Sequence, residues 1–381
     1  MNDGQSLTTA KPTDEPVSRF GRKSRWILAI IVVGVCSYFL LSDRFRPRHW
    51  YASSIAFSPD GKRLVVGVYG WRREPYETTP RYLVGGVVQT VKSLDPSTGE
   101  ELEVAEKIHS DVVRIALTPK SLSWIKFSPD GQQLAIGHWD GTTVIREVGS
   151  WKELVTLDGF PLARNVTFSP DGTSLCVGYD SGPIIWTLGD PSVRRFLDFD
   201  SGGPNSTAIS PDGGLLAFAS DWYEISIVDS QRLTLVNQFL WSEATNELAS
   251  DDETEYMNCP HVCFTPSGDE LAVACHSKDD SCSVKLINVH TGHTLHRFKG
   301  RFGAIRFSPN GSTMAIGGYK GLALIDMESR AERFYEKRER ILDLAFSPDS
   351  TMFVLGDADG RIECRSTADG RVLWKSQVGG L

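Results

Sequence analysis

The chain has 381 residues, of which 40% are hydrophobic and 23% charged, and it contains 35 glycines and 19 prolines. This composition is typical of a folded protein rich in turns, and it excludes a disordered or collagen-like chain. The formal net charge of −8 offers no basic surface to a phosphate backbone, so nucleic acid is not expected as a partner.

The first two segments predict a tail and a membrane anchor. Residues 1–25 are polar and have no apolar period, so they cannot bury enough surface to fold, and we predict a disordered N-terminal tail. Residues 26–42 then form a run of 17 residues without a charge, which is near the lower limit of about 17 residues for crossing a bilayer. The sequence therefore predicts one transmembrane helix over 26–42.

Other interpretations of the apolar run stay open. A cleaved signal peptide would also contain such a run, but no small-x-small cleavage site follows it and the tail before it is long. A buried core helix is the third interpretation. Basic residues flank the run on both sides with a slight excess before it, so the positive-inside rule slightly favours placing the rest of the chain outside the cytoplasm. We expect a single-pass membrane protein.

A pentapeptide of the form Phe-Ser-Pro-Asp-Gly recurs seven times after residue 50, with spacings of 70, 41, 41, 55, 43 and 39 residues. The regular spacings match the roughly 40 to 45 residues of a four-stranded propeller blade. Proline presets the first corner of a turn and glycine supplies its left-handed residue, so each copy predicts a hairpin between a first and a second strand. The copies begin at Phe57, Phe127, Phe168, Ile209, Phe264, Phe307 and Phe346.

Three sequence columns support the blade assignment. Counted from the first residue of each copy, positions +7 and +9 are apolar in all seven units, as one face of a buried strand requires. Position +10 is never larger than Ala, which indicates a close neighbouring sheet. We predict an all-β fold over residues 50–381, a seven-bladed β-propeller of four-stranded antiparallel blades. The expected first strand at 50–57 and last strand at 371–378 favour closure by edge packing over an exchanged strand.

The Phe-Ser-Pro-Asp-Gly, Leu-Ala-x-Gly and Asp-Gly runs resemble those of WD-repeat propellers over residues 50–381. The resemblance implies a rigid scaffold that binds other proteins. The chain departs from the family pattern, because the third strands do not end in Trp-Asp and the Gly-His pair that opens a typical repeat is missing. Propellers similar to the TolB periplasmic family have comparable hairpins, so an envelope-assembly propeller stays an alternative.

The sequence contains no Gly-x-Ser-x-Gly, no phosphate-binding Gly-x-x-x-x-Gly-Lys-Ser/Thr, no His-Glu-x-x-His and no Cys-x-x-Cys. We therefore expect no enzyme and no cofactor. A site assembled from several blades at the mouth of the central channel would escape such a motif search. A propeller enzyme or a small-ligand sensor with a channel-mouth site is thus the second interpretation.

The fifth unit is unusual because it gathers cysteine and histidine residues near one end of one blade. Thiols at strand spacing lack the short loops of zinc sites, so a metal is not expected. The simplest interpretation is that these cysteines fill small strand positions, which alanines fill in the first unit; a disulfide and a metal site are the alternatives. The weak metal candidates are Cys259, Cys275, Cys282 and His276.

The longest insertions, 69–82, 107–121 and 241–258, fall between second and third strands or between blades, and so on the rim opposite the Ser-Pro-Asp-Gly turns. Long loops on a rigid scaffold usually carry binding, and aromatic and arginine residues dominate interface energetics. We predict a monomeric propeller that acts as a membrane-anchored interaction scaffold and binds a protein partner at this loop rim. The predicted contacts are Trp71, Arg72, Arg73, Tyr76, His138, Trp139, Tyr179, Trp222, Tyr223 and Tyr319.

Overall fold

A computed structural model describes residues 49–72, 85–110, 122–138, 140–160, 163–179, 181–197, 204–220, 224–240, 261–275, 283–299, 303–318, 321–338 and 340–377. Within these ranges, no helix has the length and apolar character of a membrane span. The predicted tail (1–25) and the predicted span (26–42) lie outside the described residues. Residues Pro47–Leu381 form one compact unit, to which all the described strands belong.

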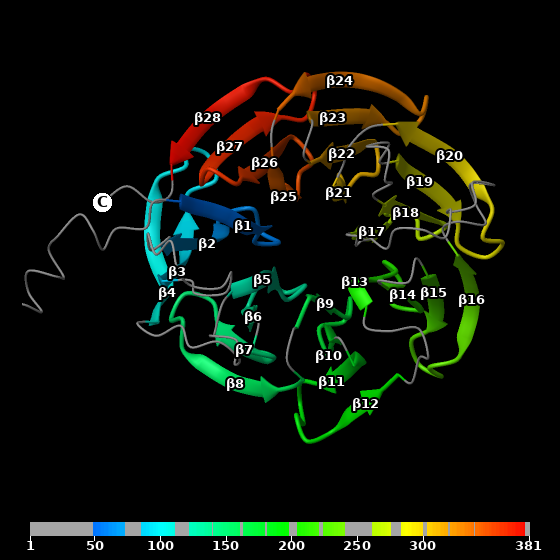
Figure 1. Cartoon of the computed structure of the whole chain (residues 1–381), viewed down its shortest axis with the longest axis horizontal. Helices are drawn as coiled ribbons and strands as arrows, with labels where there is room; N and C mark the ends of the chain where they lie inside the picture. The colour runs from blue at the N-terminus through cyan, green and yellow to red at the C-terminus, as the bar shows by residue number, and fades with distance from the viewer. Residues whose placement is uncertain are drawn as a thin grey trace, which may run out of the picture. The chain divides into compact units, whose positions relative to one another are not determined.

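The described strands form seven four-stranded antiparallel sheets, which we call blades 1 to 7, and Figure 1 shows them arranged around a common centre. Blade 1 is β1 (His49–Phe57), β2 (Leu64–Arg72), β3 (Gly85–Leu94) and β4 (Glu101–Ser110). Blade 2 is β5 (Leu122–Phe127), β6 (Gln133–His138), β7 (Thr142–Glu147) and β8 (Glu153–Asp158). Blade 3 is β9 (Asn165–Phe168), β10 (Ser174–Tyr179), β11 (Gly182–Thr187) and β12 (Arg194–Phe196).

The remaining four blades repeat this order of strands. Blade 4 is β13 (Pro204–Ile209), β14 (Leu215–Ser220), β15 (Glu224–Asp229) and β16 (Leu235–Leu240). Blade 5 is β17 (His261–Phe264), β18 (Glu270–Cys275), β19 (Ser283–Asn288) and β20 (Thr294–Lys299). Blade 6 is β21 (Ala304–Phe307), β22 (Thr313–Gly317), β23 (Gly321–Asp326) and β24 (Ala331–Lys337). Blade 7 is β25 (Ile341–Phe346), β26 (Met352–Asp357), β27 (Arg361–Ser366) and β28 (Val372–Gln377).

The first hairpin has the same register in every blade, which confirms the sequence columns. Phe57 pairs with Leu64, Phe127 with Leu134, and the equivalent residues pair in the other five blades. All seven residues at position +7 and all seven at position +9 are at most 3% exposed. These columns form the apolar faces that stack blade on blade, so the core is distributed around the ring.

Each Ser-Pro-Asp-Gly turn is closed by its own side chains. In the first copy the Ser58 hydroxyl donates to Asp60 Oδ1 at 2.6 Å and accepts from the Arg63 amide at 2.9 Å. The serine hydrogen bond is the largest cause that holds the pKa of Asp60 below its usual value, and the equivalent bond acts on four further turn aspartates. The turn therefore carries a fixed negative charge and a fixed shape.

Neighbouring turns also contact one another around the ring. The glycine of each of the first six turns has a positive φ, and a Cβ added there would lie 3.1 to 3.7 Å from the proline of the preceding blade's turn. The seventh turn has Ser350 in place of glycine, with φ at 62°, and its hydroxyl accepts a hydrogen bond from the Asn310 amide at 3.1 Å. All seven turns therefore lie on one rim, as predicted.

The small residues at position +10 lie where another side chain comes close. A Cβ on Gly356 would lie 2.8 Å from Ala52 of blade 1, and one on Gly317 would lie 2.8 Å from Ile341 of blade 7. In blade 2 the space over Gly137 is filled by the Trp124 ring of the same blade. The column is small because packing between and within blades leaves no room for a larger side chain.

The ring closes by packing of finished blades, as the sequence favours. Blade 1 contains the first four strands and blade 7 the last four, so no strand is exchanged between the ends of the described chain. The Ile55 amide of blade 1 donates to Asp343 Oδ2 of blade 7 at 2.9 Å. The Trp374 indole of blade 7 donates to the Pro96 carbonyl of blade 1 at 2.8 Å.

Blade 1 corrects one predicted boundary. Residues 69–72 and 107–110, assigned from the sequence to loops, are strand: β2 continues to Arg72 and β4 to Ser110. The first spacing of 70 residues is therefore partly extra strand length, because β3 pairs with β2 from Gly85 to Leu94 and with β4 from Val87 to Leu94. The stacked rings of Tyr51 and Tyr69, 4.8 Å apart, support this extension.

Candidate functional site

The predicted partner residues fall into two groups. Six of them lie outside the described residues: Arg73, Tyr76, Trp139, Trp222, Tyr223 and Tyr319. Trp71 and Arg72 are placed by their main chain at the end of β2, opposite Val87 and Gly85. His138 and Tyr179 end the second strands of blades 2 and 3 at the same rim.

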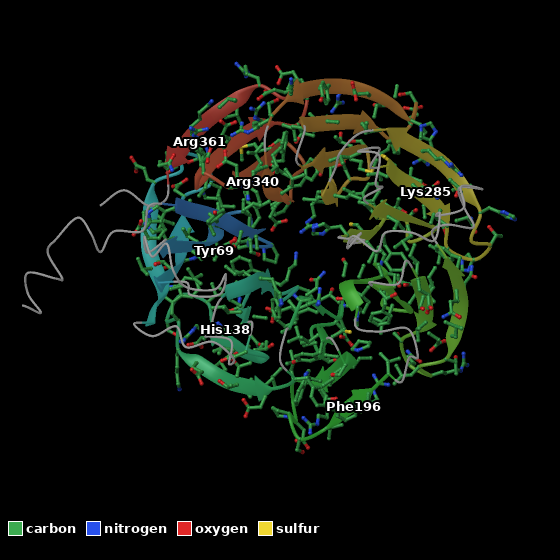
Figure 2. The ribbon with its side chains drawn as sticks, in the orientation of Figure 1. Tyr69, His138, Phe196, Lys285, Arg340 and Arg361 are labelled. Atoms are coloured by element: carbon green, nitrogen blue, oxygen red, sulfur yellow. The ribbon has the colours of Figure 1, made fainter. Side chains whose placement is uncertain are left out.

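His138 and Tyr179, both predicted as partner contacts, are buried, with 1% and 0% of the residue exposed. The Tyr179 ring is covered by Phe160 in an edge contact, with ring centroids 6.2 Å apart. Its hydroxyl lies so close to Gly159 that a Cβ there would be 2.1 Å away. Figure 2 places His138 within blade 2. Both side chains fill the space beneath the loop rim and act as packing residues.

The metal candidates receive no support from the described residues. Cys259, His276 and Cys282 lie outside them, and Cys275 is placed only by its main chain, opposite Ser283. Across the described part of the chain there is no group of three or more His, Cys, Asp or Glu residues that could hold a metal ion. Cys263 is a free, half-buried thiol.

The central channel gathers polar side chains that no sequence motif marks. The innermost strand of each blade ends at the first residue of the repeated pentapeptide, and positions −1 and −3 before that residue line a cavity of about 440 Å³. At position −1 the lining residues are Lys126, Thr167, Ala208, Cys263 and Arg306. At position −3 they are Ser54, Trp124, Asn165, Ser206, His261 and Asp343.

Part of this polar lining ties neighbouring blades together. Ser54 Oγ accepts a hydrogen bond from the Ile125 amide of the next blade at 2.9 Å, and Ser206 Oγ accepts one from the Val262 amide at 3.1 Å. Asp343 makes the equivalent contact across the closure of the ring. The inner edge of a blade has main-chain donors without a neighbouring strand, and these side chains satisfy them.

The charges of the channel are only partly balanced. Arg306 donates to Asp343 Oδ1 at 2.7 Å, so these two form an ion pair. The Lys126 ammonium has no hydrogen bond or ion pair in the part of the chain that the structure describes. Burial and the nearby Arg306 charge outweigh the opposing Asp343 charge and lower the pKa of Lys126 to about 8. Burial, followed by the same arginine, lowers the pKa of His261 to about 3, so this imidazole is neutral near pH 7.

A second cavity of about 490 Å³ lies at the Ser-Pro-Asp-Gly end of the channel, where the aromatic and proline residues of the turns line it. Lys126 and Arg306 line both cavities. The two basic side chains therefore stand at the boundary between a polar chamber and an apolar mouth. Such a mixture of apolar walls and a few polar groups is typical of small-molecule sites.

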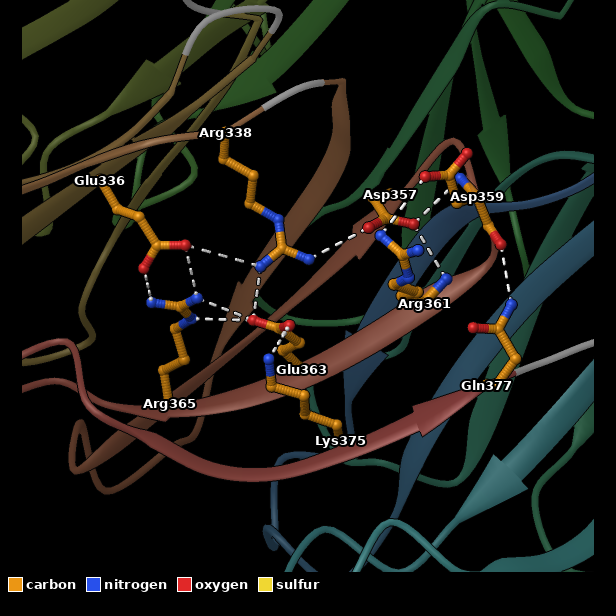
Figure 3. Close-up of polar contacts among 9 residues, drawn as sticks. All are labelled: Glu336, Arg338, Asp357, Asp359, Arg361, Glu363, Arg365, Lys375 and Gln377. Carbon is orange, nitrogen blue, oxygen red and sulfur yellow. Dashed lines mark hydrogen bonds and ion pairs between the residues drawn. The ribbon is translucent and has the colours of Figure 1, made fainter.

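A second charged cluster joins blades 6 and 7 away from the channel, and Figure 3 shows its contacts. Glu363, with 2% of its side chain exposed, accepts from Arg338 at 2.5 Å, from Arg365 at 2.7 Å and from Lys375 at 2.9 Å. Arg338 also donates to Asp357 at 3.0 Å. Arg365 reaches back to blade 6, where it donates to both carboxylate oxygens of Glu336.

This second cluster is electrostatically complete. Burial would raise the pKa of Glu363, but hydrogen bonds from Arg338, Lys375 and Arg365 outweigh it and lower that pKa to about 2. The pKa of Arg338 is raised for the matching reason, because Glu363 and Asp357 outweigh the cost of its burial. Every buried charge in the cluster has an opposite partner, so the arrangement supports a structural role.

The channel residues were missed from the sequence, although one signal marks them. Position −1 is Ala, Thr or Cys in five units and a basic residue only in Lys126 and Arg306. Comparison of that position across the units singles out both residues. Nothing in a single strand distinguishes such a residue from an exposed one.

Comparisons with known proteins agree with this architecture. The family model described as WD domain, G-beta repeat matches residues 113–145. No curated protein matches the sequence. A chain of the Kuenenia stuttgartiensis hydrazine synthase is similar in structure, with a TM-score of 0.65, 14% identity, and coverage of 86% of this chain and 99% of that chain. At this identity the likeness concerns the fold alone. The seven blades and the repeat match together support a WD-repeat propeller.

Proposed function

We propose that this protein is an interaction scaffold that binds a protein partner at its loop rim and catalyses no reaction. WD-repeat propellers commonly serve as such scaffolds. The observation that carries the proposal is the difference between the two rims. The Ser-Pro-Asp-Gly rim carries these turns, which pack on one another with Pro59 against Gly131 as one example, and the short connections between third and fourth strands.

The opposite rim carries every long connection. Because consecutive strands are antiparallel, the segments after β2, β4 and β16 leave the propeller on the side away from the Ser-Pro-Asp-Gly turns. These segments are 73–84, 111–121 and 241–260. Long connections on a rigid scaffold are where binding residues usually lie. Since His138 and Tyr179 are packing residues, the proposed contacts centre on Trp71, Trp139 and Trp222.

The proposal includes a membrane anchor over residues 26–42, with the propeller outside the cytoplasm. The support is the uncharged run of 17 residues and the slight excess of basic residues before it. No nucleic acid and no cofactor are part of the proposal. Membranes washed with carbonate test the anchor. The full chain should stay in the membrane fraction, and the chain without residues 26–42 should be absent from it.

The rim is tested by affinity capture from detergent-solubilised membranes. We expect Trp139→Ala and Trp222→Ala to weaken partner recovery by about tenfold or more, since an aromatic hot spot contributes roughly 2 kcal/mol. Lys62→Ala and Gln132→Ala, at exposed positions in turns of the opposite rim, serve as matched controls and should retain the partner. Melting curves show whether each variant is folded. Retention by the rim variants together with loss by the controls would assign binding to the opposite face.

A further inference from the structure

We propose that the central channel binds a small organic monocarboxylate between its two cavities, with Lys126 as the principal cation and Arg306 as the second. This site is separate from the loop rim and adds a ligand to the scaffold role. It rests on the charge, the size and the lining of the channel.

The charge argument begins with the ion pairs. Arg306 is already paired with Asp343, which is the only carboxylate lining the polar cavity among the described residues. Arg164 lines the same cavity and has further interactions of its own. Lys126 therefore has no ion pair of its own among the described residues, and the Asp343 carboxylate that acts on it is already paired with Arg306, although the chain as a whole has a net charge of −8. Buried charges in proteins are usually paired, and a bound anion would pair this one.

The class of anion follows from the surroundings. Lys126 offers one positive charge to one negative charge, whereas a second negative charge would meet the Asp343 carboxylate beside Arg306. The cavity of about 440 Å³ falls within the range of about 300 to 1,000 Å³ for small-molecule sites. Trp124, Val166 and Phe264 give it apolar walls, so a compact apolar body with a single carboxylate fits best.

The position of the two bases gives a ligand access to them. Lys126 and Arg306 line both the polar cavity and the cavity at the Ser-Pro-Asp-Gly end. The latter is bordered by Phe57, Phe127 and Phe307, which suit an apolar group that precedes a carboxylate. The carboxylate would then meet Lys126 while the body of the ligand stays among the aromatic rings.

Binding should depend on pH through Lys126. The charged groups that act on it are Arg306 from β21 and Asp343 from β25, the titratable groups from β17 are His261 and Cys263, and Arg164 lines the same cavity. Between pH 7 and pH 9, His261 stays neutral because its pKa is about 3, and burial raises the pKa of the Cys263 thiol. With the pKa of Lys126 at about 8, affinity for a carboxylate should fall about tenfold from pH 7 to pH 9.

Isothermal titration calorimetry of the detergent-solubilised full chain tests the proposal, with benzoate as the carboxylate probe and benzamide as its uncharged counterpart. We expect saturable binding of benzoate to one site and no binding of benzamide. Lys126→Met removes the charge and keeps the shape, and it should weaken benzoate binding at least about tenfold. Lys62→Met is the matched control at an exposed lysine and should bind like the wild type.

Four results would overturn the proposal. They are unchanged benzoate affinity in the Lys126→Met variant, equal affinity for benzamide, tighter binding of inorganic phosphate than of benzoate, and no saturable heat with benzoate. The Lys126→Met variant should remain folded because methionine is tolerated at a partly buried strand position. A melting curve for each variant separates loss of binding from loss of folding, and the pH 7 to pH 9 comparison gives an independent measurement on the wild type.

Discussion

The two charged clusters of this propeller differ in whether each charged side chain has an oppositely charged partner. Between blades 6 and 7, Glu363 and Arg365 are at most 3% exposed, and each has two or more charged partners. In the channel, Arg306 and Asp343 pair with each other, and Lys126 has no ion pair among the described residues. The first cluster is complete without a ligand, whereas the second has a charge in excess.

We interpret the cluster between blades 6 and 7 as structural and the channel cluster as a binding site. A buried ion pair contributes little net stability, but removal of one partner is costly because it leaves a buried charge behind. A closed network should therefore be sensitive to the loss of any member. A site that contains a charge without an ion pair should keep its free energy of unfolding, or increase it, when that charged residue is replaced. The propeller contains both cases in one fold, so they can be compared under identical conditions.

The largest expected effect is at Glu363. Glu363→Gln keeps the shape but leaves Arg338, Arg365 and Lys375 with one fewer anion, and we expect it to lower the free energy of unfolding by about 3 kcal/mol at pH 7. Urea denaturation measures this change. A cost below about 0.5 kcal/mol would show that the cluster is not the closed network described above.

The same residue predicts an acid transition. The pKa of Glu363 is about 2 in the folded chain, below its usual 4.5, so its stabilisation is present above about pH 4.5 and is lost as the pH falls towards 2. Wild-type stability should therefore fall more steeply than that of Glu363→Gln across this window. Denaturation midpoints of both proteins at pH 5 and pH 3 measure the difference. Parallel curves would contradict the assigned pKa.

A smaller effect of opposite sign is expected at Lys126. Because its folded pKa is lowered from 10.5 to about 8, the charged form opposes folding, and stability should rise as the pH increases from 8 to 10.5. Lys126→Met should stabilise the protein by about 1 kcal/mol at pH 7, with the advantage shrinking towards pH 10. Denaturation at both pH values measures it. A loss of stability on this substitution would mean that Lys126 has a structural partner.

The smallest effect is expected at an exposed lysine. Lys62 has 82% of its side chain exposed and a long contact of 3.9 Å with Asp60. Lys62→Met should change the free energy of unfolding by less than about 0.5 kcal/mol. Comparison of the two variants shows whether the stabilisation expected for Lys126→Met comes from its place in the channel or from methionine itself.

The fold could be predicted from the sequence because its determinants are local and repeated. Each turn of Pro and Gly fixes a hairpin, and the apolar residues seven and nine positions after its start fix the buried face, so seven copies imply seven blades. The long strands of blade 1 were not predicted. Their extra length follows from pairing of β3 with both neighbours, which a spacing of 70 residues does not distinguish from a loop.

The candidate site could not be predicted because it is assembled from seven separate strands. Lys126 in isolation resembles any solvent-facing strand residue, and its neighbours Arg306 and Asp343 are about 180 to 220 positions away along the chain. The burial of His138 and Tyr179 was missed for a similar reason. An aromatic or imidazole ring at the end of a strand can face solvent or a neighbouring blade, and only the packing of Gly159 against Tyr179 decides between them.

The closure of the ring has a consequence for how the chain is assembled. Each sheet is built from one contiguous stretch, so a ribosome can release the blades one after another with their main-chain hydrogen bonds already complete. The contact between Ile55 and Asp343 joins the first and last blades across 288 residues of chain, so it forms only after the intervening blades have been synthesised. Closure is then the docking of two finished sheets. Separation at that contact would open the ring and leave all seven sheets intact, because blades 7 and 1 are not joined by a direct chain connection as the other neighbouring blades are.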